Sequence, residues 1–263
     1  MTRPTRIYIF VTSDSPDPYV NVIVIALRLF DLREIHFVSI APPSQVDGYD
    51  GSNGSGSPAD QVAAAVRRRL EELSRGVYSK VIEGRSINVP IRPEAADKYK
   101  SAASTVRRMK SVTTERIRSV DLDAALARYI GSGGAVFDVT AFGKKDLVDV
   151  VSLMLSRGGA EVRTFEIRNK PREYNENDLF YALAEDQYSY SCLTDGDHVD
   201  LARRRMTARS IAFRNMLYVT LLIFLPVLAV QFLWPKSWLQ TMIVGLATAV
   251  SVATWLLPIL RKG

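Results

Sequence analysis

The sequence has a single cysteine, Cys192, and only two histidines, His36 and His198. One cysteine excludes an intramolecular disulfide framework and a cysteine-based zinc site, and two distant histidines have no metal-ligand spacing. We therefore expect no metal ion and a reducing, cytosolic environment. The first residues run directly into a strand-like stretch and lack the features of a secretory signal, so we expect no export.

Acidic residues are absent from 201–263, whereas this segment carries eight lysines and arginines. The whole chain has a formal net charge of +6, so residues 1–200 carry 6 − 8 = −2. A sequence-independent nucleic-acid surface needs cations spread over the folded part of the chain. We therefore expect no polymeric nucleic acid among the partners.

Two long apolar runs, 216–234 and 238–260, contain no charged residue. Each is long enough to cross roughly 30 Å of hydrocarbon as a helix, which favours a transmembrane hairpin (215–260) over a helical hairpin buried in a soluble core. The second run repeats small residues at every fourth position, which indicates close helix packing, either within the chain or between copies of it. The lipid bilayer and a homodimer or higher homo-oligomer are therefore predicted partners.

Positive charge flanks this hairpin unevenly. Five arginines lie in the basic juxtamembrane linker 195–214 and two cations follow the second span, whereas Lys236 alone lies in the connecting turn. Cations concentrate on the cytoplasmic side of a membrane, so both termini are predicted to face the cytoplasm of a multi-pass inner-membrane protein.

Residues 1–194 are predicted to form a cytoplasmic α/β domain. An apolar strand at 6–12, a buried helix at 20–30 and a second strand at 34–40 make one right-handed βαβ unit. Such units build a parallel sheet, so the fold class is a Rossmann-like parallel-sheet sandwich followed by an α-helical transmembrane hairpin. The middle of the domain is predicted to contain a flexible Gly/Ser loop at 47–58, a helix at 59–75 with a solvated basic face at 67–69, extended pieces at 80–82 and 87–91, and two helices within 94–129.

A second βαβ unit is predicted further along the chain, with a strand at 135–139, a helix at 145–157 and a strand at 161–167. Its first loop lies at the carboxyl end of a strand and at a helix N-terminus, where α/β sheets bind ligands and backbone N–H groups attract anions. Thr140 offers a hydroxyl there and Lys144 a charge for phosphate. The alternative is an ordinary turn in which Asp138 caps the helix. After this unit, alternating residues at 188–192 predict a strand in a terminal hairpin or edge pair.

These two units resemble the CARF family, the Rossmann-like sensor domains of CRISPR-linked defence proteins. The segments RIYIFVTSDSPDPYVNVIVIAL and REIHFVSI are similar to the family's first strand, loop, helix and second strand. The segments FDVTAFGKKDLVDVVSLML and GGAEVRTFEI are similar to its second motif, Asp-x-Thr-Gly-Gly-x-Lys before a helix, with Ala141 and Phe142 in place of the two glycines.

The resemblance implies a cyclic oligoadenylate bound across a dimer interface. Carried over by position, the ligand-binding residues are Thr12, Ser13, Asp14, Ser15, Thr140, Phe142, Gly143, Lys144 and Lys145. Asp14 would contact a ribose hydroxyl or cap the following helix, and Phe142 would stack on a base or close the pocket.

The resulting hypothesis is a membrane-anchored antiviral defence effector. A cyclic oligonucleotide second messenger, of the cyclic oligoadenylate class, would control membrane disruption or pore formation by the hairpins. We assign no catalytic residue and no cofactor. Two alternatives stay open, a membrane-anchored enzyme that cleaves cyclic nucleotides and a ligand-free membrane-anchored interaction scaffold.

Overall fold

A computed structural model describes residues 4–41, 57–82, 85–158, 160–169, 171, 173–195 and 218, without the side chains of 82 and 144–146. The chain divides into two units, Met1–Asp200 and Leu201–Gly263. All the strands and helices named below belong to the first unit.

The first unit is built on one mixed, mostly parallel sheet. Its six strands are β1 (Arg6–Val11), β2 (Glu34–Ala41), β5 (Ser111–Arg118), β6 (Ala135–Asp138), β7 (Glu161–Ile167) and β8 (Tyr188–Cys192). They lie in the order β5-β2-β1-β6-β7-β8, and every neighbouring pair is parallel except β7 with β8. The Rossmann-like α/β fold is therefore confirmed, with one antiparallel edge strand added to the predicted parallel sheet.

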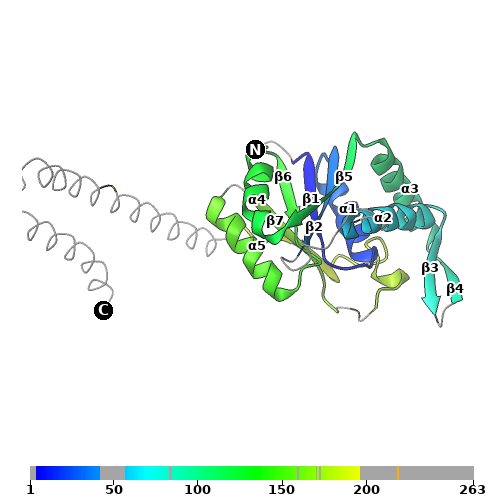
Figure 1. Cartoon of the computed structure of the whole chain (residues 1–263). Helices are drawn as coiled ribbons and strands as arrows, with labels where there is room; N and C mark the ends of the chain where they lie inside the picture. The colour runs from blue at the N-terminus through cyan, green and yellow to red at the C-terminus, as the bar shows by residue number, and fades with distance from the viewer. Residues whose placement is uncertain are drawn as a thin grey trace, which may run out of the picture. The chain divides into compact units, whose positions relative to one another are not determined.

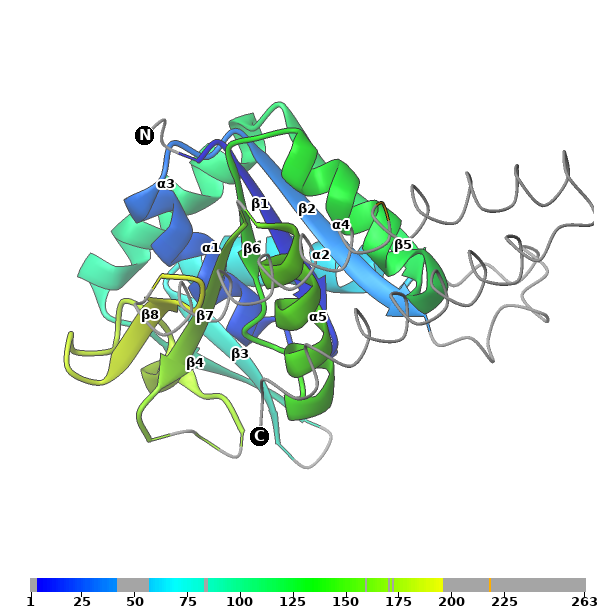
Figure 2. The same ribbon diagram turned by 90° about the vertical axis from the view of Figure 1, so that its left-hand side faces the viewer.

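Five helices cover the two faces of this sheet. They are α1 (Asp17–Leu29), α2 (Pro58–Ser74), α3 (Pro93–Arg108), α4 (Leu122–Gly131) and α5 (Lys144–Arg157). Figure 1 shows α4 and α5 on one side of the sheet and α1, α2 and α3 on the other, and Figure 2 shows β1 between β2 and β6. The result is a three-layer sandwich.

Alternation along β1 explains why both faces of the sheet are covered. Ile7 and Ile9 are fully buried in the core beneath α1, α2 and α3, whereas Tyr8 and Phe10 are buried in the core beneath α4 and α5. Successive side chains of a strand point to opposite faces, so an uninterrupted apolar strand needs a helical layer on each side.

One strand departs from prediction. Two helices were expected within 94–129, but β5 lies between α3 and α4 and pairs along its whole length with β2. Its sequence, SVTTERIR, is mostly polar, and Ile117 alone among its residues is fully buried. An edge strand with so little apolar alternation carries almost no pattern from which to predict it.

The two extended pieces expected in the middle of the domain form a separate hairpin. β3 (Val77–Ile82) and β4 (Arg85–Pro90) pair antiparallel with each other and do not join the main sheet. In Figure 1 this hairpin projects from the end of the α2 and α3 layer.

Several predictions fall on residues outside this description. Of the predicted loop 47–58, residues 47–56 lie outside it, while Ser57 caps α2 and Pro58 begins it. The linker 195–214 lies outside apart from Asp195, as do both spans apart from Tyr218. In the described part of the chain, no helix has the length and apolarity to cross a bilayer. The transmembrane hairpin stays a prediction.

Candidate functional site

The strand order reverses between β1 and β6, which makes this place a topological switch point of the sheet. From β1 the chain continues to β2 and β5 on one side, and from β6 it continues to β7 and β8 on the other. Open α/β sheets bind ligands at the carboxyl ends of the strands at such a point. A cavity of about 810 Å³ lies there, lined by residues that follow β1 and β6, by the end of β7, and by parts of α2 and β3.

The loop after β1 is held by one buried side chain. The Tyr19 hydroxyl, on α1, accepts hydrogen bonds from the backbone N–H groups of Thr12 (3.1 Å) and Ser13 (2.9 Å) and donates to the Ser13 carbonyl (3.1 Å). Burial raises the pKa of Tyr19, so it stays a donor at neutral pH. Of the four predicted residues in this loop, Ser13 and Ser15 line the cavity, whereas Thr12 and Asp14 are exposed outside its lining.

The loop after β6 is organised around a buried carboxyl group. Asp138 is 1% exposed and accepts hydrogen bonds from the backbone N–H and the hydroxyl of Thr140, both at 3.1 Å. Burial raises the pKa of Asp138 to about 7. Asp138 makes no capping hydrogen bond to α5, so the alternative in which it caps that helix does not describe this loop.

Thr140 holds the two strands beside this loop together. Its hydroxyl donates to Asp138 and accepts the backbone N–H of Phe165, on β7, at 2.7 Å. The single hydroxyl proton is therefore already used inside the protein. Thr140 lines the cavity, but its hydroxyl cannot donate to a ligand phosphate without breaking the contact with Asp138.

Replacing Thr140 by valine should therefore destabilise the fold. The substitution keeps the shape but leaves the buried carboxyl of Asp138 and the N–H of Phe165 without this partner, so we expect the free energy of unfolding to fall by about 1–3 kcal/mol. Chemical denaturation measures the change. Thr140→Ser keeps the hydroxyl and is the matched control; an equal loss in the serine and valine variants would contradict the role assigned to the hydroxyl.

The two predicted loops meet each other. The Thr12 hydroxyl donates to the carbonyl of Ala141, a residue 129 positions away in the sequence. Phe142 lines the cavity and stacks on Phe10, with ring centroids 5.1 Å apart, so its ring packs against the core beneath α4 and α5. Gly143 is exposed and precedes α5, of which Lys144 and Lys145 are the first two residues. The side chains of both lysines lie outside the described part.

The other wall of the cavity contains a group that the sequence did not predict. Arg69, on α2, forms an ion pair with Asp17, on α1, at 2.9 Å, and its guanidinium carbon lies 4.3 Å from the ring centroid of Tyr78, on β3. The Tyr78 hydroxyl donates to Asp17 at 2.7 Å. We refer to these three residues as the Asp17–Arg69–Tyr78 cluster.

The cluster corrects the prediction for the basic face of α2. Arg67 and Arg68 are exposed as expected, but the Arg69 side chain is 13% exposed and also contacts Glu72 and the carbonyl of Ser79. Burial and the adjacent Asp17 carboxylate raise the pKa of Tyr78, so its hydroxyl remains a donor. A run of three arginines carries no signal that singles out the one that turns inward.

No protein-family model matches this chain, and no curated protein matches it. The geometry of the site therefore carries the functional argument. Within the described ranges, no three His, Cys, Asp or Glu side chains come together as metal ligands.

Proposed function

We propose that this chain is a membrane-anchored effector that binds a cyclic oligonucleotide second messenger in the cavity at the β1/β6 switch point. The ligand belongs to the cyclic oligoadenylate class that the CARF resemblance implies. It binds across a homodimer and controls membrane disruption or pore formation by the spans predicted at 216–234 and 238–260. In this proposal the protein is an inner-membrane defence effector rather than an enzyme.

The observation that supports the proposal most directly is the contact between the two loops that carry the resemblance. Thr12 follows β1 and Ala141 follows β6, and the hydrogen bond between them joins these loops at the cavity. The CARF resemblance assigns both loops to one pocket, and a Rossmann-like sheet is a fold in which such loops bind nucleotides. Ser13 and Ser15 from the first loop and Phe142 from the second line the same cavity.

The ligand can control the membrane part only if it binds one of the two conformations, active or inactive, more tightly than the other. Moving a protein from a mostly inactive to a mostly active population takes about 5.5 kcal/mol of differential binding. Charge-assisted hydrogen bonds contribute about 1.5–3 kcal/mol each. A two-fold ligand meets each contact twice in a homodimer, so two contacts per subunit are enough.

Thermal unfolding of the full-length chain in detergent tests the proposal. We expect cyclic triadenylate, tetraadenylate or hexaadenylate at 100 times its dissociation constant to stabilise the fold by about 2.7 kcal/mol, which raises the midpoint by several degrees. Lys144→Ala should abolish this shift, because it removes the charge predicted to bind phosphate. Lys100→Ala, at an exposed position of α3 away from the cavity, is the matched control.

The alternatives predict different results. Hydrolysis of the cyclic nucleotide, measured by incubating it with the chain, would favour the membrane-anchored enzyme. If no cyclic nucleotide of the panel raises the midpoint of unfolding, and Lys144→Ala leaves the protein's effect on cells unchanged, the proposal is overturned and the ligand-free scaffold is favoured.

A further inference from the structure

Charge is distributed unevenly over the described lining of the cavity. Five charged side chains line it: Asp17, Arg69, Lys80, Glu166 and Glu173. Asp17 and Arg69 are paired with each other, and Arg69 also contacts Glu72. Among the described side chains of the lining, Lys80 is therefore the one cation left to meet an anionic ligand.

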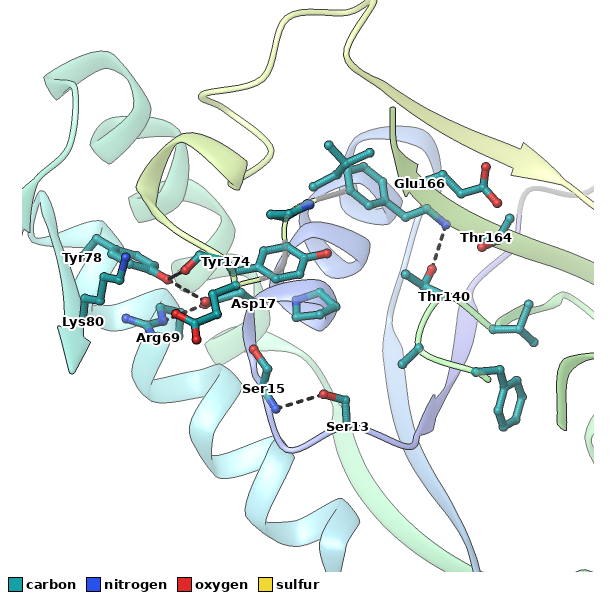
Figure 3. A pocket seen from close by; sticks show the side chains of 18 of the residues that line it. Ser13, Ser15, Asp17, Arg69, Tyr78, Lys80, Thr140, Thr164, Glu166 and Tyr174 are labelled. Carbon is teal, nitrogen blue, oxygen red and sulfur yellow. Dashed lines mark hydrogen bonds and ion pairs between the residues drawn. The ribbon is translucent and has the colours of Figure 1, made fainter. Parts of the chain in front are cut away.

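Lys80 and Glu166 lie at opposite ends of the cavity. Lys80 is on β3, beside Tyr78 and Arg69, whereas Glu166 is on β7, beyond Thr164, and Figure 3 shows the two on opposite sides. A carboxylate repels a phosphate and an ammonium group attracts it. Glu173 is a further carboxylate of the lining, and its neighbour Tyr174 contacts the Tyr78 hydroxyl through its carbonyl at 3.2 Å. Lys80 is thus the group of the described lining that attracts a phosphate, whereas Glu166 disfavours one at the β7 side.

The hydroxyl groups between these two ends carry no charge. The Thr140 hydroxyl donates to Asp138, whereas the Ser13 hydroxyl accepts the backbone N–H of Ser15 at 3.2 Å and keeps its own proton. Lys80 is the strongest described anchor for a phosphate, because its ammonium group has three donors and a full charge.

Arg69 determines where Lys80 lies. Its guanidinium group donates to the carbonyl of Ser79, the residue before Lys80, at 2.7 Å, and lies over the ring of Tyr78. Tyr78 is 2% exposed and is itself hydrogen-bonded to Asp17. The β3–β4 hairpin makes no pairing with the main sheet, so these contacts fix the strand that carries Lys80 against α1 and α2.

We propose that Lys80 contacts one phosphate of the ligand, that Arg69 positions Lys80, and that Glu166 keeps the phosphates away from the β7 side. This inference rests on the proposed function and adds a binding element, the β3–β4 hairpin, that lies outside both loops of the family resemblance. It assigns the ligand one orientation in the cavity.

Two substitutions of opposite effect test this orientation. Binding of cyclic tetraadenylate and cyclic hexaadenylate to the full-length chain in detergent is measured by calorimetry at constant salt. We expect Lys80→Gln to weaken binding by about tenfold or more, because a charge-assisted hydrogen bond is lost. Glu166→Gln should strengthen binding several-fold, because it removes a repulsive charge while keeping the side-chain shape. Lys100→Gln is the matched control and should bind as the wild type does.

The positioning role of Arg69 needs a double-mutant cycle. Lysine keeps the charge of Arg69 but not its planar set of donors, so Arg69→Lys should weaken binding several-fold when Lys80 is present. In the Lys80→Gln background the same substitution should cost nothing further. Equal losses in both backgrounds would overturn the positioning role, and thermal melting of each variant shows whether it is folded.

Failure of this inference is distinguishable from failure of the proposed function. If the wild-type chain binds neither of these cyclic nucleotides nor cyclic triadenylate, the proposed function is wrong. If the wild type binds and Lys80→Gln binds equally well, the proposed function stands and the role of Lys80 is overturned.

Discussion

Replacing Arg69 by methionine is expected to lower the free energy of unfolding by about 3–5 kcal/mol, the cost of leaving one partner of a buried ion pair uncompensated. Methionine keeps much of the length of the arginine stem but removes its charge. The Asp17 carboxylate, in a residue that is 3% exposed, then keeps only its hydrogen bond from Tyr78. The carbonyl of Ser79 also loses its donor.

Guanidinium denaturation followed by near-ultraviolet circular dichroism measures this change. Arg67→Met is the matched control, since Arg67 lies two positions earlier on α2 and is exposed. We expect the control to change stability by less than about 0.5 kcal/mol. The same small change in both variants would show that the Asp17–Arg69–Tyr78 cluster contributes little to the fold. Adding Asp17→Asn to Arg69→Met should restore part of the loss, because it removes the unpaired charge.

The second large effect is a pH dependence of stability that comes from Asp138. Burial raises the pKa of Asp138 to about 7 in the folded chain, whereas an aspartate in an unfolded chain ionises near pH 3.9. The contribution of Asp138 to the free energy of unfolding is therefore fully present below about pH 4 and is lost as the pH rises to about 7. Above that pH, Asp138 adds no further pH dependence. The loss amounts to about 4 kcal/mol over this range.

Asp138→Asn isolates this contribution. Asparagine keeps an oxygen that accepts the backbone N–H of Thr140 but cannot ionise. Measured from pH 4 to pH 8, the unfolding free energy of the wild type should therefore fall relative to that of the variant as the pH rises. Asp60 and Asp123 have pKa values lowered by hydrogen bonds, to Thr114 and to Arg157, and they shift stability in the opposite direction. Both residues are present in the wild type and in the variant, so their contributions cancel when the two unfolding free energies are subtracted. A difference that is independent of pH would contradict a raised pKa at Asp138.

Four of the six strands of the sheet were predicted within one or two residues, because β1, β2 and β6 are mostly apolar and β7 follows the glycines that end the preceding helix. Their buried positions leave little freedom in assignment. The alternation of Tyr188 and Tyr190 predicted a strand in a terminal hairpin or edge pair, and β8 is the antiparallel edge strand beside β7. β5 was missed, because it is mostly polar and Ile117 is its one buried residue, so its sequence has almost no apolar alternation.

For the candidate site too, the sequence indicated which residues lie there but not which contacts their side chains make. Ser13, Ser15, Thr140 and Phe142 were assigned to a ligand pocket by the CARF resemblance, and the structure places all four in the lining of one cavity. Their roles were not predictable in detail. Whether a hydroxyl is available to a ligand depends on its neighbours in space, and the neighbour of Thr140 is Phe165, 25 residues further along the chain.

Local sequence patterns were enough to predict the βαβ units, the two loops at the strand ends and the two apolar runs, because periodicity and turn residues act over a few positions. Folding was required to bring Asp17 to Tyr78, 61 residues away, and Thr12 to Ala141, 129 residues away. A buried ion pair forms only where packing excludes water and places both charges together, and no local pattern encodes that coincidence. The wall of the cavity that carries Lys80 is therefore a product of tertiary structure.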